Sequence, residues 1–354
     1  MIELRTFDGD PRELADFCTS TWRKRYAGQR MPTLTWTGDF LDWELFADDR
    51  EDRHFLVAAY DGTKLVGALP ARPISYTIQG QRHAGTLSSY FSVDPDYETQ
   101  AVALKLNLEL CRRHRQREFS FSTGFVFLGA SAAKGKEFWS RQPRSMKYIS
   151  KVGLWARVLD HRAVAKYEFS SRDRWAVRAL GTLQRAPNPK GPDVPTIRPF
   201  EARDLGACLR LTQRLEATSE FSYVWDEKML MRQLSFKGVP RTLVAEENGQ
   251  VAGFLNYCHL DLLGQTQIQT SVIDLVAIES LSRRTANQLI RRGLQQMQNE
   301  GCHVALLLRT ACYPKLPLIA NGFVPQPAEY YFVAQMMGGA KLPENLRRFH
   351  VHWR

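Results

Sequence analysis

The sequence predicts an α/β protein made of two related halves, each a mixed sheet with helices on both faces. One observation behind this prediction is a hairpin that occurs twice, as FLVAAYDGTKLVGA at 55–68 and as TLVAEENGQVAGF at 242–254. Each copy runs from a Leu-Val-Ala strand into an Asp-Gly or Asn-Gly pair, which is typical of a type I′ turn because these residues tolerate positive φ angles. The other observation is that the segments around the hairpins repeat at nearly the same spacing. A duplicated domain accounts for both observations.

The elements of the first half follow from alternation and from helical periodicity. A helix is expected after Pro95 because the apolar residues at 101, 104, 108 and 111 recur with a helical period. The basic run at 112–115 suits the carboxyl end of that helix. The other expected elements are a strand at 2–7, helices at 11–26 and 39–46, the hairpin, a buried strand at 86–93, a strand at 119–125, a short helix at 134–140 and a strand at 152–159.

The second half repeats this order of elements. Its opening strand at 197–200 corresponds to the segment 4–7, and a buried strand is expected at 304–308. The helix at 284–299 is the best-patterned element of the chain, with its apolar residues on one face and Gly301 placed to end it. Two domains of like topology follow from this repeat.

The domain boundaries follow from the ends of the repeat. The two domains are expected at 1–160 and 196–337, joined by a helical connector and a linker at 161–195. The linker is the segment APNPKGPDVP at 186–195, whose prolines cannot continue a helix or pair in a central strand. The basic segment 338–354 has no copy in the first half and is expected to be a mobile tail or a strap across the other domain.

Composition narrows the classes of function. The chain of 354 residues has a formal net charge of +11, which favours a polyanionic partner such as a nucleotide cofactor, an acidic substrate or RNA. No apolar run approaches the length of a membrane span, and the charged start lacks the core of a signal peptide. The six cysteines are scattered without a CxxC pair, so we expect reduced thiols in a cytoplasmic protein and no metal site. The oligomeric state stays open.

With these elements in place, the chain resembles the GNAT superfamily of acyl-coenzyme A N-acyltransferases. The resemblance lies in the order of elements, in the VA-x-x-(D/N)-G-x-x-(V/A)-G hairpin and in the strand–loop–helix that follows it, over 2–158 and 196–335. It implies a fourth strand that splays from the fifth, with a pantetheine arm in the gap and a pyrophosphate at the next helix N-terminus, where an anion is favoured in any case. The implied reaction moves an acyl group from acetyl-CoA or another acyl-CoA to a primary amine of a small molecule or a peptide.

The first candidate cofactor loop is VDPDYETQAVA at 93–103. It keeps the Val and Pro of the family's pattern and has small residues at both glycine positions. Asp94, Asp96 and Glu98, however, are three carboxylates that would repel a pyrophosphate.

The second candidate loop, at 274–287, has the opposite charge. Arg283 and Arg284 begin a helix there, and the hydroxyl groups beside them suit phosphate oxygens. We therefore expect the cofactor in the second half. Its expected binding residues are Val276, Ser282, Arg283, Arg284, Thr285, Ala286 and Asn287. The second choice, in the first half, is Val93, Gln100, Ala101 and Ala103.

The chemistry requires a group that accepts the ammonium proton and an acid for the leaving thiolate. Asp274 lies where the family often places a strand-four carboxylate, so it is the candidate base; the alternative is a strand-edge Asp bonded to backbone. The family's tyrosine acid is missing before Gly322, where Leu318 stands in its place. Tyr313, just upstream, is the candidate substitute, and a packed loop tyrosine is the alternative. In the first half Tyr90 takes the position of Asp274 and is expected in the core.

Other functions stay open. Fem-type peptidyltransferases are also tandem GNAT-like proteins, and they take aminoacyl groups from charged tRNA; the net charge and the basic run 112–117 would suit tRNA. Decay of both sites would instead leave a catalytically silent binding protein. A thiol nucleophile at Cys258 beside His259 lacks an Asn or Asp partner at a recognisable spacing.

Overall fold

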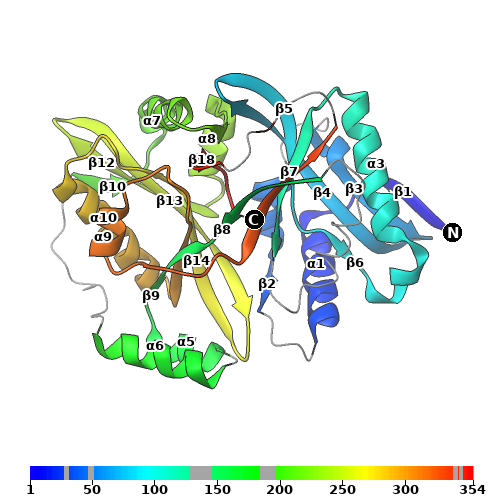
Figure 1. The fold of residues 1–354 in the computed structure, drawn as a ribbon, viewed down its shortest axis with the longest axis horizontal. Helices are drawn as coiled ribbons and strands as arrows, with labels where there is room; N and C mark the ends of the chain where they lie inside the picture. The colour runs from blue at the N-terminus through cyan, green and yellow to red at the C-terminus, as the bar shows by residue number, and fades with distance from the viewer. Residues whose placement is uncertain are drawn as a thin grey trace.

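The computed structural model describes residues 1–27, 32–46, 52–127, 146–168, 170–183, 196–337, 342 and 346–353. The expected short helix at 134–140 and the proline-rich linker at 186–195 lie outside these residues. Within them the fold is a mixed α/β architecture of two sheets that lie side by side (Figure 1).

The first sheet has its strands in the spatial order β1-β3-β4-β5-β7-β17-β8, with β5 and β7 parallel and the other neighbours antiparallel. Three short strands extend it, because β6 and β11 pair with β4 and β18 pairs with β11. The bounds are β1 Ile2–Thr6, β3 Leu56–Asp61, β4 Lys64–Ile78, β5 Gln81–Ser88, β6 Ser92–Val93, β7 Phe121–Phe127, β8 Met146–Val152, β11 Phe221–Tyr223, β17 Tyr330–Met336 and β18 Phe349–His350.

The second sheet has the matching order β10-β12-β13-β14-β15-β9-β16, with β2 paired to β13 and with β14 and β15 parallel. Its bounds are β2 Thr33–Thr35, β9 Leu154–Val158, β10 Ile197–Pro199, β12 Pro240–Glu247, β13 Gln250–Leu263, β14 Gln267–Ala277, β15 Val304–Leu308 and β16 Val324–Pro325. The helices are α1 Pro11–Tyr26, α2 Gly38–Leu45, α3 Val102–Gln116, α5 His161–Tyr167, α6 Ser171–Leu183, α7 Leu205–Ala217, α8 Glu227–Leu234, α9 Arg283–Asn299 and α10 Lys315–Ala320, and the 3₁₀ turns are Asp52–Phe55, Pro95–Gln100 and Ala202–Asp204.

Helices cover both faces of the first sheet because successive residues of its strands point to opposite sides. Val57 and Ala59 of β3 belong to the core under α3, whereas Ala58 and Tyr60 belong to the core under α1 and α2. No described helix is both long enough and apolar enough to cross a membrane.

The two predicted hairpins form, but their turns differ. In the second hairpin Asn248 and Gly249 both have positive φ, at 53° and 74°, as a type I′ turn requires. In the first, Asp61 pairs with Lys64, so the central residues are Gly62 and Thr63, and of these Gly62 alone has positive φ. Positive φ at the first central residue alone is the pattern of a type II′ turn. The predicted type I′ turn with Asp61-Gly62 at its centre was therefore wrong, because the centre lies one residue later, at Gly62-Thr63.

Each half of the chain completes the sheet of the other half. β9, from the first half, lies between β15 and β16 of the second sheet. β17, from the second half, lies between β7 and β8 of the first sheet. The same exchange occurs at the other side, where β2 pairs with β13 and β11 pairs with β4. The boundaries expected at 160 and 196 stay a prediction, but the sheets do not follow them.

Residues 346–353, after β17, extend the first sheet. β18 pairs in parallel with β11 at Phe349 and His350, and Trp353 packs its ring against Tyr330. Of the two expectations for this segment, its described part fits the strap. This strap, residues 346–353, and the exchanged strands pack into one hydrophobic core, which contains Phe221, Phe332 and Phe349.

Candidate functional site

A cavity of about 210 Å³ lies where β5 and β7 diverge in the first sheet. The two strands pair in parallel over only three residues each. After Ser88 the chain leaves β5 and turns at Tyr90, whose φ is 58°. Bulky residues seldom adopt positive φ, so the divergence of the two strands is built into the backbone at this point. The gap is the splayed pair of strands that the sequence resemblance implies.

The cavity walls come from both faces of the sheet. Leu110 of α3 lies on one side, and Trp22 and Tyr26 of α1 lie on the other. Val333 of the exchanged strand β17 also lines the cavity. Because α3 and α1 cover opposite faces, the space extends through the gap between the strands. The site therefore needs a residue from each half of the chain.

Three buried polar atoms on these walls have no hydrogen-bond partner among the described residues. They are Ser89 Oγ, Tyr90 Oη and Trp36 Nε1. Nearby, the hydroxyl groups of Ser88 and Ser122 contact each other at 2.5 Å. A buried polar group without a partner is costly, so such atoms indicate a place for a polar ligand group. An elongated ligand with amide groups and an apolar body fits these walls.

The N-terminus of α3 follows directly on this part of the chain. Ala101, the residue before the helix, has φ 55° and ψ 26°, and no side chain caps the first turn. Uncapped N–H groups and the helix dipole together favour an anion at this end. The first turn of α3 can therefore hold a phosphate through backbone groups alone.

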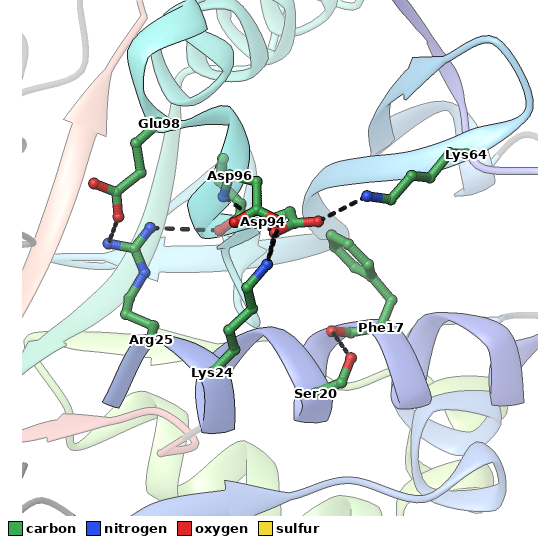
Figure 2. Close-up of polar contacts among 9 residues, drawn as sticks. Phe17, Ser20, Lys24, Arg25, Lys64, Asp94, Asp96 and Glu98 are labelled. Atoms are coloured by element: carbon green, nitrogen blue, oxygen red, sulfur yellow. Dashed lines mark hydrogen bonds and ion pairs between the residues drawn. The ribbon is translucent and has the colours of Figure 1, made fainter. Parts of the chain in front are cut away.

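Cations pair with the three carboxylates that precede α3 (Figure 2). Lys24 Nζ of α1 lies 2.8 Å from Asp94 Oδ1 and 2.5 Å from Asp96 Oδ2. Arg25 of the same helix contacts Glu98 at 2.8 Å. The carboxylates lower the free energy of the charged ammonium, so the pKa of Lys24 is raised by Asp94 and then Asp96.

Lys64, next to the turn of the first hairpin, adds a third cation at 3.1 Å from Asp94 Oδ2. Burial raises the pKa of Asp94, but the bonds from Lys24, the Asp96 backbone and Lys64 outweigh it, so the carboxyl stays ionised and paired. The repulsion expected from three carboxylates is thus offset by three cations. The sequence argument against this loop was incomplete because Lys24 and Arg25 are far from it along the chain.

The second candidate loop already holds a carboxylate at its helix N-terminus. Ser282 Oγ accepts a hydrogen bond from the Thr285 N–H at 3.2 Å and so caps α9. Glu247 Oε1 accepts a hydrogen bond from the Ser282 N–H at 2.9 Å. Bonds from Thr285 and Ser282 lower the pKa of Glu247, which keeps it anionic. Two N–H groups at this helix start, those of Ser282 and Thr285, are therefore engaged by the protein itself.

The other residues expected in this loop are placed as follows. Val276 and Ala286 are buried in the core under α9, Arg283 and Arg284 are exposed, and Asn287 receives a hydrogen bond from Asn321. In the first-half set, Val93 is buried and pairs with Gly67, Gln100 and Ala101 are exposed, and Ala103 is half-buried. Neither placement tests the predicted roles.

Asp274 is buried at the boundary between the halves, with 7% of its surface exposed. Gln233 Nε2 donates to its Oδ2 at 3.1 Å, and the Cys258 thiol lies 3.9 Å from the same oxygen. Burial raises its pKa to about 7, although the Gln233 amide and the Arg72 guanidinium oppose the change. A carboxyl group with this pKa can exchange a proton at neutral pH.

The surroundings of Asp274 approach the cavity of the first half. Leu34, Trp36 and Tyr90 line that cavity and also a small adjoining space, whose wall includes Cys258. Cys258 therefore stands between the cavity and Asp274. The candidate base from one half lies next to the cavity of the other half.

Tyr313 has a different environment. It is buried in the core under α9, where its hydroxyl donates to the Leu308 carbonyl and accepts from the Thr310 N–H at 3.3 Å. Burial raises the pKa of Tyr313 above its usual value. These contacts support the packed-loop alternative, and its role as an acid stays a prediction.

Sequence reasoning missed the polar groups of the cavity wall and the cations at Lys24, Arg25 and Lys64. The sequence offers one signal for the cavity wall, because the repeat predicts Tyr90, which lines the cavity, at the position of the candidate base Asp274. The cations carry no local signal, since their partners come from another element.

Comparison with solved structures defines the class of fold. The chain superposes on Saccharomyces cerevisiae N-myristoyltransferase with bound myristoyl-CoA over 96% of this chain and 83% of the other, at a TM-score of 0.72 and 14% identity. It also matches a GCN5-related N-acetyltransferase from Kribbella flavida (TM-score 0.51, 15% identity, 94% and 70% covered) and another from Anabaena variabilis (TM-score 0.52, 8% identity, 96% and 73% covered).

The chain thus has a tandem GNAT-like fold, which confirms the predicted fold class. No known family's sequence profile matches the chain. No curated protein matches it in sequence.

Proposed function

We propose that the protein is an N-acyltransferase that takes an acyl group from acyl-CoA bound in its first half and moves it to an amine. The observation that carries this proposal is the cavity between β5 and β7, which lies beside the uncapped N-terminus of α3. The solved neighbours with this fold are named as acyltransferases, and one contains myristoyl-CoA. This choice reverses the expectation that the second half binds the cofactor.

The fit of the cofactor is argued from residues of this chain. The diphosphate would be held by the first N–H groups of α3, and Lys24 and Lys64 would offset the negative charge of the carboxylates that precede the helix. The pantetheine arm would lie in the gap, where Ser89 Oγ and Tyr90 Oη are available for its amides. Bound there, the cofactor supplies an activated thioester carbonyl for attack by the amine.

Asp274 is the proposed acceptor of the ammonium proton. Its carboxylate is behind Cys258, so the proton passes through a water molecule. The pKa near 7 means that a large fraction of Asp274 is ionised at neutral pH and able to accept a proton. A small-molecule or peptide amine as the acceptor is consistent with the solved neighbours, which are named as N-acyltransferases. The cavity and the charges leave both the amine and the length of the acyl chain open.

Two matched double variants test the location of the cofactor. Gln100→Glu with Ala101→Glu lowers the charge at the start of α3 by two units, and Arg283→Gln with Arg284→Gln does the same at the start of α9. We expect the first pair to weaken acetyl-CoA binding at least tenfold, since like charges about 4 Å apart repel by a few kcal/mol at an effective dielectric near 20. The second pair should bind as the parent does. Isothermal titration calorimetry measures both.

The reverse pattern would place the cofactor in the second half. Absence of binding by the parent protein at millimolar acetyl-CoA and myristoyl-CoA would remove the enzymatic proposal altogether. The silent binding protein would then be favoured. A role with charged tRNA stays a prediction, which a gel shift across a salt series would test.

A further inference from the structure

A second cluster of reactive side chains lies on the opposite face of the second sheet from Asp274. His259 Nδ1 is 3.1 Å from Cys302 Sγ, and His259 Nε2 is 3.0 Å from Glu300 Oε2. Ser271 Oγ donates a hydrogen bond to Cys302 Sγ at 2.9 Å. Residues 259 and 271 are neighbours in the β13–β14 ladder, and Glu300 and Cys302 follow the end of α9. The fold therefore places the Cys302 thiol, the His259 imidazole and the Glu300 carboxylate in a chain of contacts.

Other side chains hold the Glu300 carboxylate in place. Tyr257 Oη donates to Glu300 Oε2 at 2.9 Å, Gln296 Nε2 donates to Oε1 at 3.1 Å, and Arg241 lies 3.6 Å from Oε1. Because Nε2 faces Glu300, it carries a proton, and Nδ1 is left to exchange one with the sulfur. A nucleophile, a base and a group that orients the base are the parts of an activated nucleophile.

The His259 imidazole places a positive charge beside the sulfur of Cys302. Burial lowers the pKa of His259, but its bonds to Cys302 and Glu300 raise it to about 9, so the imidazole is protonated at neutral pH. A cation beside a sulfur stabilises the thiolate, which is the nucleophilic form of cysteine. Burial raises the pKa of the other five thiols, Cys18, Cys111, Cys208, Cys258 and Cys312.

A hollow of about 390 Å³ gives access to this region. Cys302 lines it together with His161, Arg162, Gln298 and His303. His161 Nε2 and Gln298 Oε1 are buried polar atoms without a hydrogen-bond partner in the part of the chain that the structure describes. Cys302 itself is only 2% exposed, so the hollow restricts it to small reagents. The wall carries both the Arg162 guanidinium and the Asp160 carboxylate, so it suits a small polar molecule and does not suit an acyl chain.

We propose that Cys302 is a nucleophilic thiol site, positioned by His259 and Glu300, which exchanges with a small polar disulfide entering through the hollow. The Cys302 thiolate attacks one sulfur of the disulfide, and a new S–S bond to Cys302 forms as the original S–S bond breaks. The departing thiolate takes the proton of the His259 imidazolium. The product is a mixed disulfide on Cys302 and one free thiol. The site is separate from the cavity between β5 and β7 and does not depend on acyl transfer.

Bis(2-hydroxyethyl) disulfide, a small polar disulfide, is the probe. It reacts with the folded full-length chain, and the adduct is located by mass spectrometry after digestion. We expect Cys302 to be modified first, at least tenfold faster than any other cysteine, and Cys302→Ser to lose this adduct. Cys111 is the internal control because, at 5%, it is the most exposed of the six thiols. The parent rate should change little between pH 6 and pH 8, because the His259 imidazole beside the sulfur stays protonated over this range.

His259→Asn and Glu300→Gln separate positioning from folding. His259→Asn should slow the reaction at pH 6 at least tenfold and restore the steep pH dependence of an ordinary thiol. Glu300→Gln should give a smaller loss in the same direction. Melting curves by circular dichroism identify any variant that is unfolded. Faster reaction at Cys111, reaction of Cys302 only in denaturant, or an unchanged rate in folded His259→Asn would each overturn the proposal.

Discussion

At the scale of single residues, burial decides the chemistry of Asp274. Gln233 and Cys258 hydrogen-bond to its carboxyl, and its pKa rises because little water reaches it. Tyr90, which the sequence repeat predicts at the matching position of the first half, lines the cavity with its hydroxyl buried and unpaired among the described residues.

Asp274 should make stability fall as pH rises. Its pKa is about 7 in the folded protein and 3.8 in an ordinary environment. Between these values the folded protein keeps a proton that the unfolded chain has lost, so the free energy of unfolding decreases with rising pH. Asp274→Asn removes this slope and should be more stable than the parent at pH 8, by at most about 4 kcal/mol, with no gain at pH 4. Urea unfolding at both pH values measures the difference, and an equal effect at both would refute it.

The rate of acyl transfer should depend on the same group in the opposite sense. The proposed base acts as a carboxylate, so kcat/KM for acetyl transfer should rise with pH up to about 7 and then level. Asp274→Asn should lower kcat/KM at least a hundredfold while acetyl-CoA still binds. Calorimetry and initial rates distinguish the two effects. Full activity in the variant would assign the proton to another group.

At the scale of elements, β17 is the strand by which the second half enters the first sheet between β7 and β8. Phe332 is fully buried, stacks on Phe349 of β18 at 5.5 Å, and contacts Phe221 of β11 and Phe125 of β7. One ring thus connects strands from both halves. Within the described residues, β8 joins the sheet through β17 alone.

Phe332→Ala should destabilise the protein by about 3–5 kcal/mol, because it leaves a cavity among the three rings of Phe125, Phe221 and Phe349. Tyr331→Ala, on the neighbouring and half-buried residue, is the matched control and should cost clearly less. Denaturant midpoints at constant slope measure both changes. Similar losses in the two variants would mean that the shared aromatic core does not hold β17.

At the scale of the whole molecule, the two halves interlock. Each sheet contains strands from both halves at two separate places. The cavity has a wall from β17, and its neighbouring carboxylate comes from β14, so the proposed site also draws on both halves. Separate domains that share only a linker would not behave this way.

A protease site inserted at 190 should therefore yield two fragments that stay together. After cleavage, we expect one peak of unchanged volume in size-exclusion chromatography, and cooperative melting close to that of the uncut protein. The fragment 1–160 expressed alone should fail to melt cooperatively, because β8 lacks β17 and β9 lacks β15. Separation of the fragments under native conditions would contradict the interlocked arrangement.

The sequence predicted the features that local patterns encode. The doubled hairpin and the order of elements led to the tandem fold, because turn residues and periodicity act over a few positions. The exchange of β9 and β17 was missed, since a strand's sequence specifies its faces but not its neighbours. The same limit applied to the site: Asp94 and Glu98 are visible in their loop, whereas Lys24 and Arg25, which pair with them, lie on α1.

The exchange of strands also gives the molecule a relation to oligomers. Two copies of one fold that each donate an equivalent strand to the other follow the self-complementary logic of an isologous dimer. Here both copies belong to one polypeptide, so their association does not depend on protein concentration. Each copy is then free to vary at its own site while the partner's strands keep its sheet complete. In topology, this chain is a strand-swapped dimer whose two subunits are covalently joined.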